Sequence, residues 1–169
     1  MKKNIKFIKR LVINIGLILL ILTLEKNVNR IYLKSEITDS FLSHWPFYLV
    51  ISIFMTLIYW KLESNKIKAS FFKFIFIPTF FGLTFFLSNR IELWLNSKTE
   101  KEVQTCEYIA LLKGFAYGEM GIKNLATAEI DKIKISENKI KGIKENDTIK
   151  LEFKKGIFNF RYSPIIREE

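Results

Sequence analysis

Three long apolar stretches lie between Leu11 and Leu95, and they constrain the fold more than any other feature of the chain. A water-soluble domain of this size has no interior large enough to bury three such helices, whereas about 20 apolar residues are enough to cross a bilayer. The sequence therefore predicts a membrane protein of three transmembrane α-helices, with spans at about residues 8–24, 42–60 and 70–90, followed by a small C-terminal β-rich domain.

The first stretch is short for a span. It holds 14 uncharged residues, from Leu11 to Leu24, and Lys9 and Arg10 come directly before it. Long basic side chains can reach the headgroups, which lengthens the usable helix by about a turn. A cleaved signal peptide is the alternative interpretation, but signal peptidase needs small residues before the cut, and this run ends in LTLE. We therefore expect an uncleaved anchor.

The other two stretches are clearer. No Asp, Glu, Lys or Arg occurs in the 21 residues from Ser40 to Trp60, and eight Phe residues lie between Phe71 and Phe86. At 100° per residue these Phe side chains spread around the whole helix, which favours contact with lipid over a groove for a partner. Aromatic residues near the span ends predict anchors in the headgroup layer. The predicted anchors are Trp45, Tyr48, Tyr59, Trp60 and Trp94.

Basic residues predict the orientation in the membrane. The N-terminal tail and the Lys61–Lys73 connector together have nine Lys and Arg residues, whereas the Glu25–Asp39 connector has three. By the positive-inside rule, the N-terminus lies in the cytoplasm and the C-terminal domain lies outside it. The topology-setting residues are Lys2, Lys3, Lys6, Lys9, Arg10, Lys61, Lys66, Lys68 and Lys73. A composition rich in Ile, Lys, Asn and Phe favours a bacterial plasma (inner) membrane.

The positive charge of the chain belongs mostly to the membrane region. Of the net charge of +10, residues 1–97 carry +8 and residues 98–169 carry +2. A nucleic-acid footprint would need a one-sided basic patch on the folded domain, and charges of both signs are interspersed there. We therefore expect the lipid bilayer as a partner, with its anionic headgroups, and no nucleic acid. The predicted domains are a membrane domain at 1–97 and an extracytoplasmic domain at 98–169.

The C-terminal domain reads as strands. Apolar and polar residues alternate in two runs, Ile149–Lys154 and Phe158–Ser163, which predicts a hairpin with a turn at Lys155-Gly156. Pro164 is expected to end the ladder pairing. We expect about five or six short strands within residues 103–166, in a curled sheet or partial barrel.

The segment between Val103 and Leu125 is ambiguous. VQTCEYIALL is compatible with a strand that runs into a short helix, and Gly114, Gly118 and Gly121 are compatible with a bent strand pair or with a ligand loop. The glycine spacing does not match a phosphate-binding loop. Cys106 is the only cysteine, which excludes an internal disulfide, and its apolar neighbours predict a buried strand position.

Residues for catalysis are scarce. The chain has one histidine, His44, which is expected at the outer interface of the second span. Glu129 and Asp131 share one face of a predicted strand, but spacing alone does not make them an acid–base pair. We expect no catalytic residues, no metal site and no cofactor.

Polar residues within the spans are expected to link the helices. These residues are all uncharged, and they are Asn14, Ser52, Thr56, Thr79 and Thr84. Transport paths usually contain a buried charge, so interhelical hydrogen bonds are the simpler interpretation. Arg90 and Glu92 are interpreted as the end of the third helix rather than as a conducting pair.

These features predict a non-catalytic membrane protein whose C-terminal domain is a binding or interaction module, with a protein partner or a second copy of the chain bound to it. One biological form is an immunity protein against a membrane-targeting or exported toxin. The alternatives are a membrane-perturbing effector, gated by a ligand-sensing β domain, and an accessory subunit of a transporter or secretion complex. No motif in the sequence chooses among them.

Overall fold

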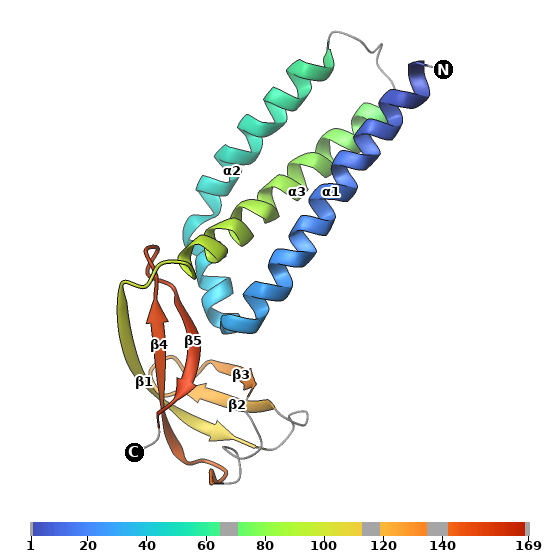
Figure 1. Ribbon diagram of the computed structural model, residues 1–169. Coiled ribbons are helices and arrows are strands. Elements are labelled where there is room, and N and C mark those ends of the chain that lie inside the picture. Colours follow the sequence, from blue (N-terminus) through green and yellow to red (C-terminus); the bar gives the residue numbers. More distant parts are fainter. Residues whose placement is uncertain (1, 65–70, 113–118, 135–141, 168–169) are drawn as a thin grey trace. The chain divides into compact units, whose positions relative to one another are not determined.

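The computed structural model describes residues 2–64, 71–112, 119–134 and 142–167 of the chain (Figure 1). The chain divides into two units, which we call the helical unit and the sheet unit. The helical unit comprises Met1–Val28 and Phe41–Trp94, and the sheet unit comprises Asn29–Ser40 and Leu95–Glu169.

Three helices come first along the chain: α1 (Lys2–Ile31), α2 (Lys34–Ser64) and α3 (Phe71–Asn96). Each covers one of the predicted spans. The polar connector predicted at Glu25–Asp39 is mostly helical, and only Tyr32 and Leu33 separate α1 from α2. A helix pairs its own backbone groups in lipid and in water alike, so it need not end where the apolar run ends.

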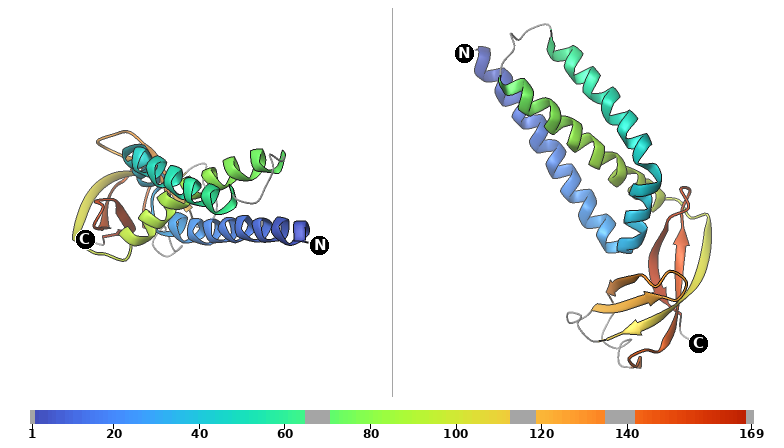
Figure 2. Two further views of the ribbon diagram at one scale, coloured as in Figure 1. Left: turned by 90° about the horizontal axis from the view of Figure 1, so that it is seen from above. Right: turned by 180° about the vertical axis from the view of Figure 1, so that it is seen from behind.

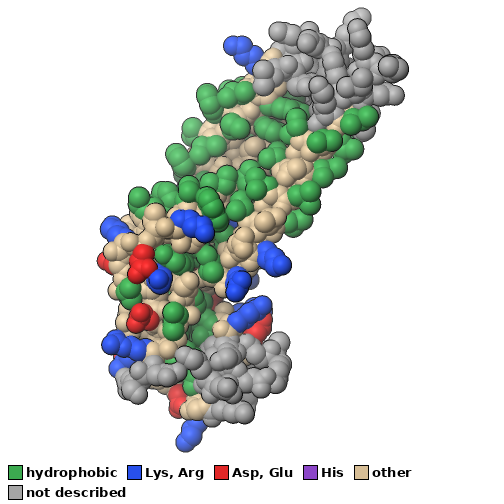
Figure 3. Space-filling model, in the orientation of Figure 1, with side chains coloured by type: hydrophobic (Ala, Val, Ile, Leu, Met, Phe, Trp, Pro, Cys, Tyr) green, Lys and Arg blue, Asp and Glu red, His purple; other side chains and the backbone are tan. Residues whose placement is uncertain are grey.

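Two of the helices contain segments that are long and apolar enough to cross a membrane, at Leu11–Ile31 and Lys34–Lys61. Over its described residues, α3 does not meet the same test of length and hydropathy. Many apolar side chains of the helices are exposed, and Figure 3 shows them gathered over the helices. An apolar surface of this extent is unfavourable in water and is typical of contact with lipid.

The five described strands form one curled antiparallel sheet (Figures 1 and 2). They are β1 (Glu102–Leu111), β2 (Glu119–Asn124), β3 (Ile130–Lys134), β4 (Thr148–Lys155) and β5 (Arg161–Ile166). Their order across the sheet is β3-β2-β1-β4-β5. Ile149, Leu151 and Phe153 of β4 are buried, as their alternation with charged residues predicts. The expectation of a curled β-rich domain is therefore confirmed.

β5 begins later than its pattern predicts. Phe158 and Phe160 lie in the connection from β4 rather than in the strand. The backbone N–H of Phe158 donates to Oδ1 of Asn96 at 2.9 Å, and Asn159 has a φ of 67°. The left-handed conformation of Asn159 turns the chain at this point, so the connection includes residues that the alternation assigned to the strand.

The expectation that Pro164 ends the pairing is wrong. Ile165 and Ile166 lie beyond it and still pair with Glu152 and Leu151 of β4. β5 is an edge strand, with one side outside the ladder, and such a strand tolerates a residue that lacks an N–H group.

The ambiguous segment is resolved in part. β1 continues through Leu111, so the first nine residues of that segment are strand rather than the start of a helix. Gly114 and Gly118 lie outside the described residues, whereas Gly121 lies in β2 opposite Leu111. Cys106 lies in a strand, as expected, but it is only partly buried.

Candidate functional site

The corner between α1 and α2 belongs to the sheet unit. We call residues 29–40 the corner segment, because they group with residues 95–169. Leu33 is 2% exposed and packs among the buried side chains of the sheet. The ring of Tyr32 lies 5.9 Å from that of Tyr162 on β5. The core of the sheet unit therefore includes a residue that comes from between two helices, about 70 residues before the first strand.

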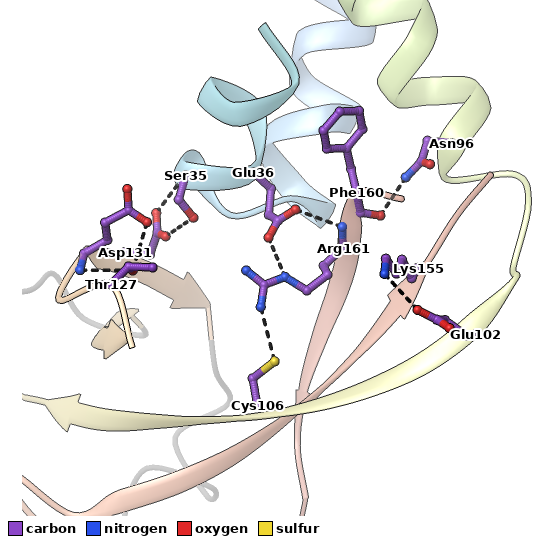
Figure 4. Close-up of polar contacts among 11 residues, drawn as sticks. Ser35, Glu36, Asn96, Glu102, Cys106, Thr127, Asp131, Lys155, Phe160 and Arg161 are labelled. Atoms are coloured by element: carbon purple, nitrogen blue, oxygen red, sulfur yellow. Dashed lines mark hydrogen bonds and ion pairs between the residues drawn. The ribbon is translucent and has the colours of Figure 1, made fainter. Parts of the chain in front are cut away.

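An ion pair joins the corner segment to β5 (Figure 4). Nε of Arg161 lies 2.5 Å from Oε1 of Glu36, and the backbone N–H of Arg161 donates to Oε2 at 2.9 Å. The side chains are 22% and 6% exposed, respectively. Arg161 also donates from Nη1 to Sγ of Cys106 at 3.2 Å, and its guanidinium lies 5.3 Å from the ring centre of Phe153. Burial opposes the charge, but Glu36 outweighs it and raises the pKa of Arg161.

A second contact caps α2. The carboxylate of Asp131, on β3, accepts hydrogen bonds from the backbone N–H of Ser35 at 3.1 Å and from its hydroxyl at 2.5 Å (Figure 4). The first N–H groups of a helix lack partners in the helix and carry partial positive charge, so a carboxylate stabilises them. Asp131 is 7% exposed, whereas Glu129 is exposed and accepts a hydrogen bond from Thr127. The two carboxylates therefore serve different local contacts.

Asn96, at the end of α3, fixes the connection between β4 and β5. Its Nδ2 donates to the hydroxyl of Tyr32 at 2.9 Å and to the carbonyl of Phe160 at 2.8 Å, while Oδ1 accepts from Phe158. Asn96 is fully buried. Gly156 lies so close that a Cβ atom there would overlap the backbone oxygen of Asn96. The sheet unit thus holds the C-terminal ends of α1 and α3 and the N-terminal end of α2.

Tyr108 leaves a polar atom unmatched in the core of the sheet unit. Its side chain is 1% exposed, and its hydroxyl has no hydrogen-bond partner among the described residues. Its ring lies 5.9 Å from that of Phe153. Burial raises the pKa of Tyr108 to about 12, against an opposing effect of Arg161. The hydroxyl is therefore neutral at physiological pH.

A polar network lies within the helical unit and joins α2 to α3. Nδ1 of His44 lies 2.5 Å from Oε1 of Glu92, and the hydroxyl of Tyr48 donates to Oε2 of the same carboxylate. Asn89 donates to the hydroxyl of Tyr48 at 3.1 Å. Arg90 donates to Oδ1 of Asn89 at 2.9 Å. The expectation that Glu92 merely ends the third helix therefore misses its contacts with α2.

Three further polar atoms of the helical unit are buried and have no hydrogen-bond partner among the described residues. They are Oδ1 of Asn14, Oγ of Ser52 and Oγ1 of Thr56. The expected interhelical hydrogen bonds are therefore not formed by these atoms. The same expectation is wrong for Thr79 and Thr84, whose hydroxyls donate to carbonyls of their own helix.

The predicted membrane anchors differ in their surroundings. Three are exposed by 39–50%: Trp45, Trp60 and Trp94. Tyr59 stacks on Phe80, with ring centres 4.4 Å apart. Tyr48 is 1% exposed and faces Glu92 inside the helical unit. Anchoring stays a prediction for all five.

For most of the topology-setting residues, the structure does not describe the side chain. Lys61 is described and is exposed. Lys66 and Lys68 lie outside the described residues, and nothing is assigned to the side chains of the others. Across the described part of the chain, no group of three or more His, Cys, Asp or Glu residues could hold a metal ion.

The signal for the polar interior is present in the sequence, as a spacing of four. Polar residues recur at this spacing on α2 at His44, Tyr48, Ser52 and Thr56, and on α3 at Thr84, Ser88 and Glu92. Residues four apart share one face of a helix, so each set forms a stripe. The corner contacts have no such signal, because Ser35–Asp131 and Glu36–Arg161 join residues 96 and 125 positions apart.

No protein-family model matches this chain, and no curated protein or solved structure matches it either.

Proposed function

We propose that the protein is a non-catalytic, multi-pass membrane protein that presents its sheet unit as an interaction module for another macromolecule. The observation that carries this proposal is that the sheet unit is made of two separate segments, the corner segment and residues 95–169. Because the corner segment and residues 95–169 fold together, they lie on the same side of any membrane that the helices cross.

This grouping supports a third span. If α1 and α2 both cross the bilayer, the corner segment lies on one side and Ser64 lies on the other. Leu95 belongs to the same unit as the corner segment, so the chain must return between these two residues. α3 is the helix in that interval, and a helix is the conformation that satisfies its backbone groups in lipid. We therefore infer that α3 spans the membrane as well.

The sidedness rests on charge. The N-terminal tail and the second connector are rich in Lys, which supports a cytoplasmic location for both. With three spans, the sheet unit then lies outside the cytoplasm. A bacterial plasma membrane fits this arrangement, and the lipid bilayer is itself a partner of the helical unit.

A binding role suits the chemistry of the sheet unit. Its buried charged groups serve the corner contacts, and its exposed surface carries single apolar side chains such as Ile130, Ile157 and Ile165, each more than half exposed. The expected ligand is a protein or a second copy of the chain. An immunity protein that blocks a membrane-targeting or exported toxin is one biological form of this role, and an accessory subunit of a transporter or secretion complex is another.

Site-specific photo-crosslinking in native membranes tests the binding role. A photoreactive residue in place of Ile165 is expected to give a discrete adduct, at twice the mass of the chain for a homodimer or at another defined mass for a partner. The matched control is a photoreactive residue in place of Leu42, which is 63% exposed on α2 and is expected to meet lipid. Free monomer alone at Ile165 would contradict the proposal.

One observation favours a second candidate, a membrane-perturbing effector gated by the sheet unit. Because this unit holds ends of all three helices, a ligand that shifts the sheet would also shift the helices. This candidate needs the sheet unit in the cytoplasm. Measuring the side of the membrane on which the sheet unit lies therefore separates the two candidates.

A further inference from the structure

The interior of the helical unit is the reverse of its surface. Leu42, Val50 and Phe54 of α2 are more than 60% exposed, whereas Tyr48 and Ser52 of the same helix are at most 1% exposed. A stripe of polar side chains inside a bundle with an apolar exterior is unfavourable for a helix in lipid unless the polar groups have hydrogen-bond partners or bind an ion or water. The four-residue stripe of α2 therefore requires an explanation beyond packing.

One end of this interior holds ionisable groups from all three helices. His44 and Glu92 form one of the contacts between α2 and α3, and Oε1 of Glu25 on α1 lies 3.4 Å from Nη2 of Arg90. Glu92 is 11% exposed and His44 is 38% exposed. The imidazole of His44 is therefore partly exposed, whereas the carboxylate of Glu92 is mostly buried. Tyr48 is the further titratable group that faces Glu92.

The interior continues beyond this cluster as oxygens without partners. Ser52 and Thr56 lie one and two turns beyond Tyr48 on the same stripe of α2. α1 and α2 run in opposite directions (Figures 1 and 2), so residues that precede Glu25 on α1 and residues that follow Tyr48 on α2 lie toward the same end of the helices. Asn14 precedes Glu25 by about 16 Å along α1, at 1.5 Å per residue. A buried polar atom without a hydrogen-bond partner is unfavourable, and an internal water needs several polar partners. Oxygens of this kind are suitable partners for internal water.

We propose that this polar interior binds and relays protons. His44 takes a proton from water at Nε2 and releases its Nδ1 proton across 2.5 Å to Oε1 of Glu92, which becomes a neutral acid. Glu92 then gives the proton to water held by Ser52, Thr56 and Asn14, which passes it on to solvent beyond Thr56. Both side chains return to their starting charge, and a half-turn of the imidazole ring restores the starting tautomer of His44. Among the described residues, the titratable or charged groups of this cluster are the carboxylates of Glu25 and Glu92, the imidazole of His44, the phenol of Tyr48 and the guanidinium of Arg90.

The positions of the polar groups favour a proton over a metal cation. Arg90 lies against Asn89, whose partner is Tyr48, and its own counter-ion is Glu25. A metal cation would also need several oxygen ligands at one point, whereas the unpartnered oxygens are spread along two helices. A relay needs only neighbouring groups that exchange protons. This inference rests on the proposed insertion of the helices into a membrane.

Proton flux into vesicles tests the relay. The purified full-length chain is reconstituted into phospholipid vesicles that contain a pH-sensitive dye, and a potassium diffusion potential drives protons inward. The wild type is expected to acidify the interior several-fold faster than vesicles without protein. Glu92→Gln is expected to reduce the rate to that of empty vesicles, because the amide cannot accept and release the proton.

A paired variant separates the relay from folding. Ser52→Ala with Thr56→Val removes two hydroxyls that have no hydrogen-bond partner among the described residues, so the fold is expected to persist while flux falls. Thr79→Val is the control, because that hydroxyl is exposed and donates to its own helix. A wild-type rate in the double variant or in Glu92→Gln would overturn the relay.

Flotation of the same vesicles separates the two proposals. Protein that floats with the vesicles but conducts no faster than empty ones overturns the relay and leaves the membrane assignment intact. Protein that stays at the bottom of the gradient overturns the membrane assignment itself.

Discussion

At the scale of single residues, the hydroxyl of Tyr108 is a cost to the sheet unit rather than a support. It is buried without a hydrogen-bond partner among the described residues, beside the charged pair of Glu36 and Arg161. A desolvated polar atom without a partner is unfavourable by about 1–3 kcal/mol. The ring, by contrast, packs against Phe153 and contributes to the core.

Tyr108→Phe is therefore expected to leave the free energy of unfolding at neutral pH unchanged or higher. The pKa of Tyr108 is raised from 10.0 to about 12, so the unfolded chain ionises first and wild-type stability falls as pH rises from 10 to 12. This contribution is at most about 1.4 kcal/mol per pH unit, and the variant lacks it. Urea denaturation of the detergent-solubilised protein between pH 7 and pH 12 measures both effects. A clear loss of stability at pH 7 would show that the hydroxyl has a partner.

Removal of one charge from the corner contact is expected to be costly. Glu36→Gln keeps the size of the side chain but leaves the half-buried Arg161 without its counter-ion, which destabilises by about 3 kcal/mol. Glu100→Gln is the matched control, because Glu100 and Lys154 form a pair at 2.6 Å that is nearly half exposed. Proteolysis of the two variants under increasing urea is expected to show early unfolding of Glu36→Gln alone. Equal behaviour of the two would contradict the role of the corner contact.

At the scale of elements, the end of α3 and the connection from β4 to β5 fit each other closely. Gly156→Ala is expected to destabilise the sheet unit by about 1–3 kcal/mol, because a Cβ atom there overlaps Asn96. Gly142→Ala is the control, since a Cβ atom there meets nothing within 4 Å. The difference between the urea midpoints of the two variants measures the contact. A midpoint for Gly156→Ala equal to the wild type would mean that the connection can move away from α3.

The elements that follow from the sequence are those whose signal is local. The alternation in β4 predicts its buried face because Leu151 and Phe153 report their own environment. The start of β5 does not follow, because the contact of Phe158 with Asn96 joins residues 62 positions apart. The polar stripe of α2 could be predicted only in part. Its spacing of four is visible in the sequence, but the contact between His44 and Glu92 of α3 is not.

At the scale of the whole molecule, the grouping of the corner segment with the sheet unit is the result that the sequence could not supply. Residues 29–40 contribute Leu33 to the core and Glu36 to the ion pair, and nothing local marks them for either role. The predicted boundary at residue 97 separates these partners, whereas the structure unites them. If α2 crosses the membrane, this grouping requires the chain to cross back between Ser64, at the far end of α2, and Leu95.

Labelling of single cysteines tests that claim most directly. In a Cys106→Ser background, cysteine replaces one of three exposed residues: Asp39 in the corner segment, Lys144 in the sheet unit or Lys61 near the end of α2. Intact spheroplasts are treated with a membrane-impermeant maleimide. Asp39→Cys and Lys144→Cys are expected to react, whereas Lys61→Cys is expected to react only after permeabilisation.

Comparing the labelling of the three cysteine variants shows both the number of spans and the orientation. Reaction at Asp39→Cys and Lys144→Cys only after permeabilisation, with Lys61→Cys open from outside, would keep three spans, reverse the orientation and favour the effector. Opposite sidedness of Asp39→Cys and Lys144→Cys, or equal labelling of all three in intact spheroplasts, would contradict the account.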